Sequence, residues 1–460
     1  MLIADGRVIR KVFAEGLNDV ETFLHSSFSN KLMEQGCIVG TRILDASQFP
    51  ATVHQRNFAS GACIILEHPL IFFPTYPAEW PPEMLHAAAK LTLDMVAGYR
   101  AEGLGLKDAT PHNIMFEGHR PVFVDVLSIE KRNPCDPLWK AQAQFERTFL
   151  LPLLANRYFR VSLAQIFLTS RDGMEPEALY AFCSILRRIT PPFFSLATLP
   201  TLLGSKRMAR DASMYAEHHL QDPEKAGFIL EYTFKRMRRL LKRAAPDSSS
   251  QRSAWSDYET SNSYAVSEAD AKYACVENLM HIYTPRTVLD IGCNTGKFSR
   301  LAAKSGARVV AIDRDPVVVG RLWNSALKED LDILPLVVNL ACPTPATGWR
   351  NGETLPFIKR SEGKFEAVLM LAIVHHLLVT ERIPLREILK LAADLTIKLL
   401  LIEFVGKDDP MFIGLCKGRQ DLFSWYNRDV FESALSEFFK IVNVSSAGVT
   451  HRCLYLLEKI

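Results

Sequence analysis

The sequence predicts an α/β protein with a C-terminal domain built on a mostly parallel sheet, preceded by an α+β domain with a helical extension. Three observations support this. The 460 residues exceed what one hydrophobic core holds. Residues 287–298 combine an apolar strand pattern, a glycine turn and a helical pattern. Strand and helix patterns then alternate to the end of the chain. The predicted boundaries are 1–135 for the α+β domain, 136–245 for the helical extension, 246–264 for a linker and 265–460 for the α/β domain.

Composition places the chain among ordinary globular proteins. Charged residues make up 23% and the formal net charge is +3, so no global field points to nucleic acid or membrane. Nine cysteines without C-x-x-C or Cys/His ligand spacing predict a reducing compartment and argue against a zinc ribbon or a disulfide framework. The N-terminus lacks the apolar core of a signal peptide, and the most apolar segment, 61–77, is too short to span a bilayer. We expect a cytoplasmic protein, and its oligomeric state is left open.

The first 75 residues predict short strands at 8–13, 37–44 and 62–68. After Pro81 and Pro82, apolar residues at spacings of 4, 3, 4 and 4 predict an amphipathic helix that is ended by Gly103 and Gly105. These residues are Met84, Ala88, Leu91, Met95 and Tyr99.

Residues 106–130 predict a polar loop followed by a β-hairpin, with Asp125 in the second strand. Asp108, Asn113 and Asp125 stand at spacings of 5 and 12. This pattern resembles the catalytic loop and metal-binding aspartate of protein kinases and aminoglycoside-type phosphotransferases, which implies a nucleotide and magnesium site. The chain departs from that family at Lys107 and has no glycine-rich phosphate loop upstream. The alternative is an α+β scaffold whose polar loop caps the fold.

Residues 138–243 are helical in pattern, and the last helix is basic on one face. Phe234, Met237, Leu240 and Leu241 share its apolar face. The opposite face carries Lys235, Arg236, Arg238, Arg239, Lys242 and Arg243. Such a helix either binds acidic partners such as RNA or phospholipid, or is a surface helix with a solvated face.

The C-terminal domain is predicted from strands at 287–291, 308–313, 333–339, 365–372 and 399–404, separated by helical patterns and preceded by a helix at 269–282. A late helix near 428–438 leads to a terminal hairpin. This order predicts a seven-stranded sheet with helices on both faces and an antiparallel strand at the end. Ligands of such sheets bind at the carboxyl ends of the parallel strands.

The turn after the first of these strands, D-I-G-C-N-T-G, is the main functional motif. Gly292 and Gly296 allow a tight turn and a close backbone approach to a ligand. Asp313 ends the second strand, where a carboxylate can accept both hydroxyl hydrogens of a ribose. A dinucleotide enzyme requires G-x-G-x-x-G to hold a pyrophosphate, and this spacing is absent.

The motif resembles the first motif of S-adenosylmethionine-dependent methyltransferases of the Rossmann-like class. That resemblance implies S-adenosylmethionine as the cofactor. Asp290 is expected to orient the turn or to reach the cofactor's ammonium group through water, and Asn339 is expected to contact adenine. The residues predicted to bind the cofactor are Asp290, Gly292, Cys293, Asn294, Thr295, Gly296, Asp313 and Asn339.

His375 and His376 follow the fourth strand, near the expected position of the transferable methyl group. A hydroxyl acceptor needs a base, and a histidine has a suitable pKa. The alternative is that one histidine packs under the next helix and the other caps it. Glu403, at the end of the fifth strand, is predicted to orient the substrate or the base, while Asp408 and Asp409 are predicted to cap a helix.

Over nearly its full length the chain resembles a bacterial two-domain methyltransferase family that includes nodulation proteins acting on lipochito-oligosaccharide signals. The segments that carry the resemblance are LKDATPHNIMF, the linker with Trp255, Tyr258 and Tyr264, LDIGCNTG, IVHHL and IEFVGKDDPM. The linker aromatics are expected either to cover the adenine or to staple the linker to the domain. The tetrapeptide N/D-P-P-Y/F of nucleic-acid base methylation is absent. We expect an oxygen or nitrogen of a small molecule or glycoconjugate as the acceptor, with RNA as the alternative.

Overall fold

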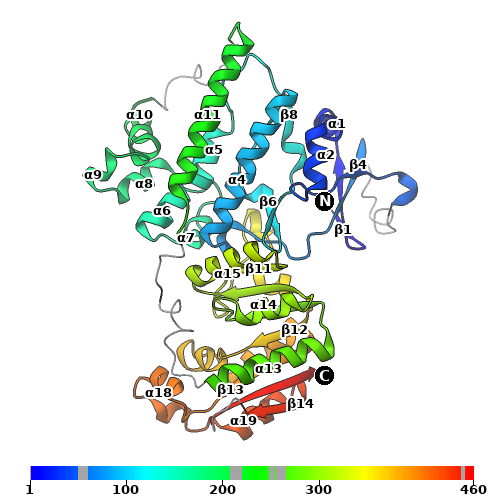
Figure 1. Ribbon diagram of the computed structural model, residues 1–460, viewed down its shortest axis with the longest axis vertical. Coiled ribbons are helices and arrows are strands. Elements are labelled where there is room, and N and C mark those ends of the chain that lie inside the picture. The colour runs from blue at the N-terminus through cyan, green and yellow to red at the C-terminus, as the bar shows by residue number, and fades with distance from the viewer. Residues whose placement is uncertain (1, 50–60, 208–219, 248–252, 254–265, 447–450) are drawn as a thin grey trace. The chain divides into compact units, whose positions relative to one another are not determined.

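The computed structural model describes residues 2–49, 61–207, 220–247, 253, 266–446 and 451–460. The chain forms two compact units (Figure 1). The first comprises Met1–Ala78 and Pro82–Pro246, and the second comprises Glu79–Pro81 and Asp247–Ile460. The linker aromatics Trp255, Tyr258 and Tyr264 lie outside the described residues.

The first unit begins with an antiparallel sheet in the order β1-β2-β4-β3. Its strands are β1 (Leu2–Ala4), β2 (Arg7–Val12), β3 (Arg42–Ile43) and β4 (Ile64–Pro69). The prediction of one continuous strand at 37–44 is wrong, because the two ends of this segment pair with different partners. The backbone groups of Cys37 and Val39 bond to Phe123, and only Arg42–Ile43 pairs with β4.

Helices α1 (Leu17–His25) and α2 (Ser27–Glu34) precede the long helix α4 (Pro82–Tyr99), which confirms the predicted amphipathic helix. The next strands are β5 (Leu104–Leu106), β6 (Ile114–Glu117), β7 (Arg120–Phe123) and β8 (Ile129–Lys131). The hairpin of β6 and β7 is confirmed. Asp125 lies after β7 rather than in it, because the pairing ends at Phe123 and the Val124 N–H donates to Asn113 O.

The rest of the first unit is helical. It contains α5 (Gln142–Phe145), η7 (Glu146–Leu150), α6 (Leu151–Phe159), α7 (Leu163–Phe167), α8 (Pro176–Phe182), α9 (Ile185–Arg188), η8 (Phe194–Thr198), α10 (Leu199–Arg207) and α11 (Pro223–Ala244). The predicted apolar face of α11 is buried. Among the described residues, no helix is long and apolar enough to cross a membrane.

The second unit is built on a seven-stranded sheet in the order β11-β10-β9-β12-β13-β15-β14. The strands are β9 (Thr287–Ile291), β10 (Arg308–Asp313), β11 (Ile333–Val337), β12 (Phe365–Met370), β13 (Thr396–Val405), β14 (Phe439–Ser446) and β15 (Arg452–Lys459). The first five in the spatial order are parallel, and β15 is antiparallel to both its neighbours. The mixed seven-stranded sheet predicted from the sequence is confirmed.

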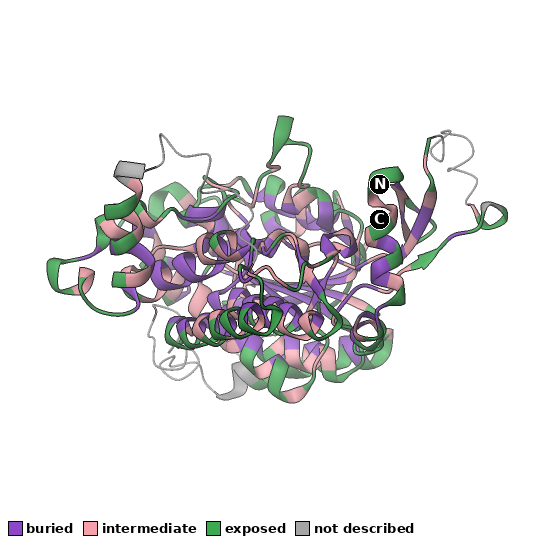
Figure 2. Ribbon diagram, turned by 90° about the horizontal axis from the view of Figure 1, so that it is seen from above, coloured by how far each residue is buried: buried purple, intermediate pink, exposed green. Residues whose placement is uncertain are grey.

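Helices pack around this sheet, and its central strands are almost wholly buried. Figure 2 draws buried residues in purple, and they gather in the interior of the molecule. The helices are α13 (Val266–Tyr283), α14 (Lys297–Lys304), α15 (Pro316–Glu329), α16 (Phe357–Ser361), α17 (Leu385–Leu395), α18 (Pro410–Cys416) and α19 (Arg428–Leu435). The chain leaves β9 toward β10 on one side, and β12 lies on the other. Strand order reverses there, so a crevice is expected at the carboxyl ends of β9 and β12.

Candidate active site

The turn between β9 and α14 has the backbone geometry that its glycines predict. Gly292, Asn294 and Gly296 have φ angles of 77°, 49° and 83°. A side chain on Gly296 would overlap Leu322 of α15, so this position needs glycine for both its angle and its packing. The N–H groups of Gly292 and Cys293 donate to Ile312 O at 2.8 and 3.0 Å. The turn is therefore fixed to the end of β10.

Asp313, the last residue of β10, is tied to this turn. One carboxylate oxygen accepts from the Asn294 N–H and the other from the Asp315 N–H, both at 3.0 Å. Burial raises the pKa of Asp313, while the two N–H donors act in the opposite direction. Each oxygen retains acceptor capacity, because a carboxylate oxygen takes more than one hydrogen bond. The arrangement fits a ligand with neighbouring hydroxyl groups.

Asp290 lies inside the domain, with 2% of its surface exposed. Its Oδ2 accepts a hydrogen bond of 2.5 Å from Ser299 Oγ, in the first turns of α14. Burial raises the pKa of Asp290 to about 6. The side chain therefore joins β9 to α14 from beneath the glycine turn.

The remaining predicted cofactor residues lie around the same strand ends. Cys293 is buried, and burial raises the pKa of its thiol, which keeps it protonated. Thr295 is half-buried in the turn. Asn339 follows β11, and its Oδ1 accepts from the Ala341 N–H at 3.1 Å. The N–H of Val338 donates to Asp313 O, which brings Asn339 beside the end of β10.

The segment after β12 packs directly against the glycine turn. Ala372 has a φ angle of 54°, which an L-residue rarely adopts. Ile373 lies 3.4 Å from the position that a Cβ on Gly292 would occupy. The predicted catalytic histidines follow this contact, and they share the strand-end edge with the cofactor residues.

His375 and His376 lie side by side, with ring centroids 4.4 Å apart. His375 is buried and His376 is half-buried at the start of η11 (His376–Thr380). Burial lowers the pKa of His376 to about 4 and lowers the pKa of His375 well below its usual value. Both imidazoles are therefore neutral at pH 7, and the lowered pKa makes each a weaker base than a solvated histidine, which differs from the pKa expected from the sequence.

Glu403 is fully buried at the end of β13 and lies at the centre of an ionic network. Its Oε2 accepts from the Ala372 N–H and from Lys272 Nζ, both at 2.8 Å. Its Oε1 accepts from Arg452 at 3.3 Å. Arg452 also binds both carboxylate oxygens of Asp409, at 2.7 and 3.0 Å. Two cations and two carboxylates thus compensate each other inside the domain.

This network contains residues that the sequence did not single out. Lys272 comes from α13 and Arg452 begins β15. Neither stands in a motif, and only the antiparallel pairing of β13 with β15 brings Arg452 near Glu403. Asp409 caps α18 through the Met411 N–H at 2.8 Å, which confirms its predicted role, while Asp408 is exposed.

The first unit brings together only part of the predicted nucleotide site. Asp125 binds Arg10 at 2.9 Å through Oδ1 and Ser128 Oγ at 2.7 Å through Oδ2. Asn113 donates to the same Ser128 hydroxyl at 3.3 Å. Asp108 is exposed and accepts a long hydrogen bond from Gln144. Among the described residues, no group of three or more His, Cys, Asp or Glu could hold a metal ion.

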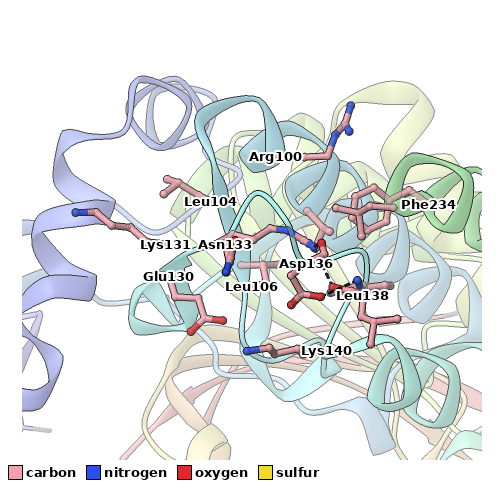
Figure 3. A pocket seen from close by; sticks show the side chains of 15 residues that line it. Arg100, Leu104, Leu106, Glu130, Lys131, Asn133, Asp136, Leu138, Lys140 and Phe234 are labelled. Atoms are coloured by element: carbon pink, nitrogen blue, oxygen red, sulfur yellow. Dashed lines mark hydrogen bonds between the residues drawn. The ribbon is translucent and has the colours of Figure 1, made fainter. Parts of the chain in front are cut away.

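A pocket of about 120 Å³ lies elsewhere in the first unit, beside β5, β8 and α11 (Figure 3). Its apolar lining includes Leu104, Leu106, Trp139 and Phe234. The charged side chains do not converge in Figure 3, where Arg100 and Lys131 extend in different directions. None of the predicted site residues lines this pocket.

Comparison with known proteins shows that the chain is similar to methyltransferases. The family described as "Methyltransferase domain" matches residues 229–436. Nodulation protein NoeA of Rhizobium meliloti (strain 1021) is 30% identical over 419 residues, which cover 91% of this chain and 86% of NoeA.

Two solved structures align at low TM-scores. The bifunctional kinase-methyltransferase WbdD aligns over 41% of this chain and 39% of its own, with 20% identity and a TM-score of 0.29. The N-methyltransferase NodS from Bradyrhizobium japonicum WM9 aligns over 42% of this chain and 96% of its own, with 13% identity and a TM-score of 0.31. The match to NoeA extends over both units, and the methyltransferase-domain match includes the strand ends that carry the site. The chain therefore belongs to the family of methyltransferases that includes NoeA.

Proposed function

We propose that the second unit transfers a methyl group from S-adenosylmethionine to an oxygen or nitrogen of a small-molecule or glycoconjugate acceptor. The observation that carries this proposal is the pairing of Asp313 with the glycine turn. The Asp313 carboxylate, which can accept further hydrogen bonds, lies beside a turn whose two glycines have positive φ angles, and both are at the point where the strand order of the parallel part of the sheet reverses.

The residues present fit this cofactor. Asp313 would accept the ribose hydroxyl hydrogens, the turn from Gly292 to Gly296 would contact the amino-acid portion, and Asn339 would contact the adenine. A cofactor without a pyrophosphate needs no cluster of phosphate-binding glycines. When bound, S-adenosylmethionine supplies an electrophilic methyl group.

The histidines and Glu403 have separate roles in the proposal. His376 is the better candidate for the base, because it is half-buried, whereas the neighbouring ring of His375 is buried. Glu403 is a positioning residue. Its hydrogen bond to the Ala372 N–H holds the left-handed backbone from which the histidine segment starts. Proton removal and alignment are what a hydroxyl acceptor requires for methyl transfer.

The proposed acceptor class is based on the sequence resemblance to nodulation proteins. The alternative acceptor, RNA, has less support from the structure. Two cations of the basic helix α11 are engaged within the first unit, because Arg238 pairs with Asp94 and Lys235 pairs with Glu231. The nucleotide alternative for the first unit also has little support. Arg10 already neutralises the Asp125 carboxylate that a magnesium ion would need.

Calorimetric titration with S-adenosylmethionine and S-adenosylhomocysteine tests the cofactor assignment. We expect micromolar binding by the full chain, weakened at least about tenfold in Asp313→Ala because charge-assisted hydrogen bonds are lost. Gly292→Val should abolish binding, because a β-branched side chain is strained at a φ angle of 77° and its Cβ would contact Ile373. Asp421→Ala removes an exposed carboxylate of the same unit and should bind normally.

A folded wild-type protein that binds neither compound contradicts the proposal. Binding that survives in Asp313→Ala would place the cofactor elsewhere. Once binding is established, acceptors can be screened with a labelled methyl donor, with oligosaccharides and RNA as separate arms. Methylation of RNA alone would replace the proposed acceptor class.

A further inference from the structure

The outward side of α11 combines cationic and aromatic side chains along most of the helix (Figure 1). The buried residues of α11 form one apolar stripe at helical spacing. They are Ala226, Leu230, Phe234, Met237, Leu240, Leu241 and Ala244. The residues on the opposite side follow one another in steps of three or four, and all of them are exposed. We call these residues the α11 outer stripe, and they are Lys225, Phe228, Tyr232, Lys235, Arg239, Lys242 and Arg243.

The aromatic residues of the outer stripe lie close together on the helix. Phe228 is 73% exposed and Tyr232 is 57% exposed, and Ile229 beside them is 38% exposed. A surface helix that is only solvated carries polar residues on its outer side. The inward side of the same turns is already filled by Leu230 and Phe234. Three exposed large apolar side chains within five residues therefore indicate a contact surface.

The charge of α11 is one-sided. Its seven lysines and arginines stand against two glutamates, which gives the helix a formal charge of +5. Residues 232–246 contain six cationic residues and no Asp or Glu. The second half of the helix is thus a concentrated positive segment in a chain whose total formal charge is only +3. Local positive charge of this density attracts an anionic partner.

Some of these cations hold the helix in place, and others remain available. Lys235 pairs with Glu231 at 2.7 Å, and Arg238 pairs with Asp94 of α4 at 3.1 Å. Three exposed cations have no carboxylate partner among the described residues. We call them the available cations, and they are Arg239, Lys242 and Arg243.

The helix is fixed at both ends, so the outer stripe is preformed. Asp222 caps its start by accepting from the Glu224 and Lys225 N–H groups at 2.9 and 3.3 Å. At its end, Arg157 of α6 donates to Arg243 O at 3.0 Å. Phe228 and Arg243 are 15 residues apart in sequence, or about 22 Å along the helix axis. A partner would meet a straight, ordered line of side chains and would not have to order the helix first.

We propose that the α11 outer stripe binds the surface of an anionic lipid bilayer, with the helix axis parallel to the membrane plane. Phe228 and Tyr232 enter the boundary between the headgroups and the acyl chains, and the available cations contact lipid phosphates. The partner must offer negative charge and an apolar interior along the same line. A bilayer that contains anionic lipids offers both over an extended surface.

Two other partners fit the outer stripe less well. RNA shares the negative charge, but sites that combine cations with stacking aromatic residues for single strands are grooves. The outer stripe instead lies on the side of a helix opposite its buried face. A second copy of this chain would place two segments of charge +5 against each other in a two-fold contact. The proposal does not depend on the methyltransferase activity, since it rests on residues of the first unit alone.

Co-sedimentation of the full chain with vesicles tests this proposal. We expect binding to vesicles of phosphatidylcholine with about 30 mol% phosphatidylglycerol, and at least about tenfold weaker binding to phosphatidylcholine alone. The triple variant Arg239→Gln, Lys242→Gln, Arg243→Gln should bind the anionic vesicles at least about thirtyfold more weakly, because each cation near the surface contributes about a fivefold factor. The matched control Lys328→Gln, Lys390→Gln, Lys398→Gln removes the same charge from exposed positions of the second unit and should bind like the wild type.

The double variant Phe228→Gln, Tyr232→Gln measures the apolar part. We expect at least about a tenfold loss of binding to the anionic vesicles, because the inserted apolar surface is removed. Its control is Trp349→Gln, Leu355→Gln, which changes residues of the second unit that are 80% and 56% exposed and should leave binding unchanged. Glutamine preserves helix propensity, and circular dichroism with thermal unfolding verifies that each variant is folded.

Three outcomes overturn the proposal. One is a folded wild-type protein that does not sediment with anionic vesicles. Another is an equal loss of binding in the lysine control, which would mean that only the total charge matters. The third comes from a mobility-shift assay with single-stranded RNA. RNA binding that the arginine and lysine variant of α11 abolishes, while its vesicle binding equals that of the wild type, would assign the outer stripe to RNA.

Discussion

Two aspartates, Asp313 at the end of β10 and Asp125 just after β7, are both predicted to bind a ligand, yet their surroundings differ. The oxygens of Asp313 accept from the backbone N–H groups of Asn294 and Asp315. Those of Asp125 are taken by the side chains of Arg10 and Ser128. Backbone donors orient a carboxylate and leave its charge available, whereas a guanidinium neutralises it. The partners of an acidic residue therefore decide whether it can serve a ligand.

The largest expected effect lies in the buried network of the second unit. Replacing Glu403 by Gln removes one charge and leaves Lys272 and Arg452 with Asp409 as their only carboxylate in the network. We expect a loss of about 3–5 kcal/mol in the free energy of unfolding, because breaking a buried ion pair leaves an uncompensated charge. Thermal or denaturant unfolding measures it, with Glu437→Gln as an exposed ion-pair control. A loss below about 1 kcal/mol would show that the network behaves like a surface pair.

The glycine turn gives the next effect. Gly296→Ala should destabilise the second unit by about 3 kcal/mol, because its Cβ would overlap Leu322 and the φ angle of 83° is unfavourable for alanine. Gly414→Ala is the matched control, since it lies in α18 with open space around its Cβ position. The free energy of unfolding, measured with denaturant, and the affinity for the cofactor should both decrease in Gly296→Ala, and neither should decrease in Gly414→Ala. Equal stability of the two variants would contradict the tight packing of the turn on α15.

A smaller effect concerns pH. Because the pKa of His376 is about 4, its imidazole stays neutral from pH 6 to 7.5, and methyl transfer should change less than about twofold over this range. For stability, the unfolded histidine binds more protons than the folded one between pH 6.5 and 4. The contribution of His376 is thus complete above pH 6.5 and is lost as the pH falls toward 4. An acid limb of activity with a midpoint near pH 6.5 would assign proton removal to an ordinary solvated base.

The smallest effect is expected at the Asp125 pair of the first unit. Both partners are more than a quarter exposed, so Asp125→Asn should cost less than about 1 kcal/mol of unfolding free energy. If the wild-type protein binds ATP in the presence of Mg²⁺, Asp125→Asn should bind it equally well. Magnesium-dependent binding lost in Asp125→Asn would mean that Arg10 moves aside and would restore the nucleotide alternative.

Features of this fold that depend on neighbouring residues could be predicted from the sequence, whereas contacts between residues far apart in the chain could not. The ends of β9 and β10 agree with the predicted bounds, because continuous apolar runs followed by Gly292 or by Asp313 define them locally. The prediction of a single strand at 37–44 was wrong, because Cys37 and Val39 pair with Phe123 and no local pattern reveals this pairing.

The network around Glu403 was missed for the same reason. Lys272 and Arg452 stand 131 and 49 residues from Glu403, and neither belongs to a motif. Only the sheet order, with β15 inserted beside β13, places them together. Local signals thus define the strand ends that carry the predicted cofactor residues, while long-range pairing determines what surrounds the predicted catalytic ones.

The position of Arg452 also has a consequence for biosynthesis. Translation delivers β9 to β13 and Asp409 before β15, so Glu403 and Asp409 exist for a time without the arginine that bridges them. A nascent chain at that stage also has β13 exposed as an edge strand, without the partner that β15 later supplies. We expect the ribosome-bound intermediate to be vulnerable to aggregation and proteolysis until β15 emerges. Insertion of this strand then covers the edge of β13 and supplies the guanidinium that joins Glu403 to Asp409 in a single event.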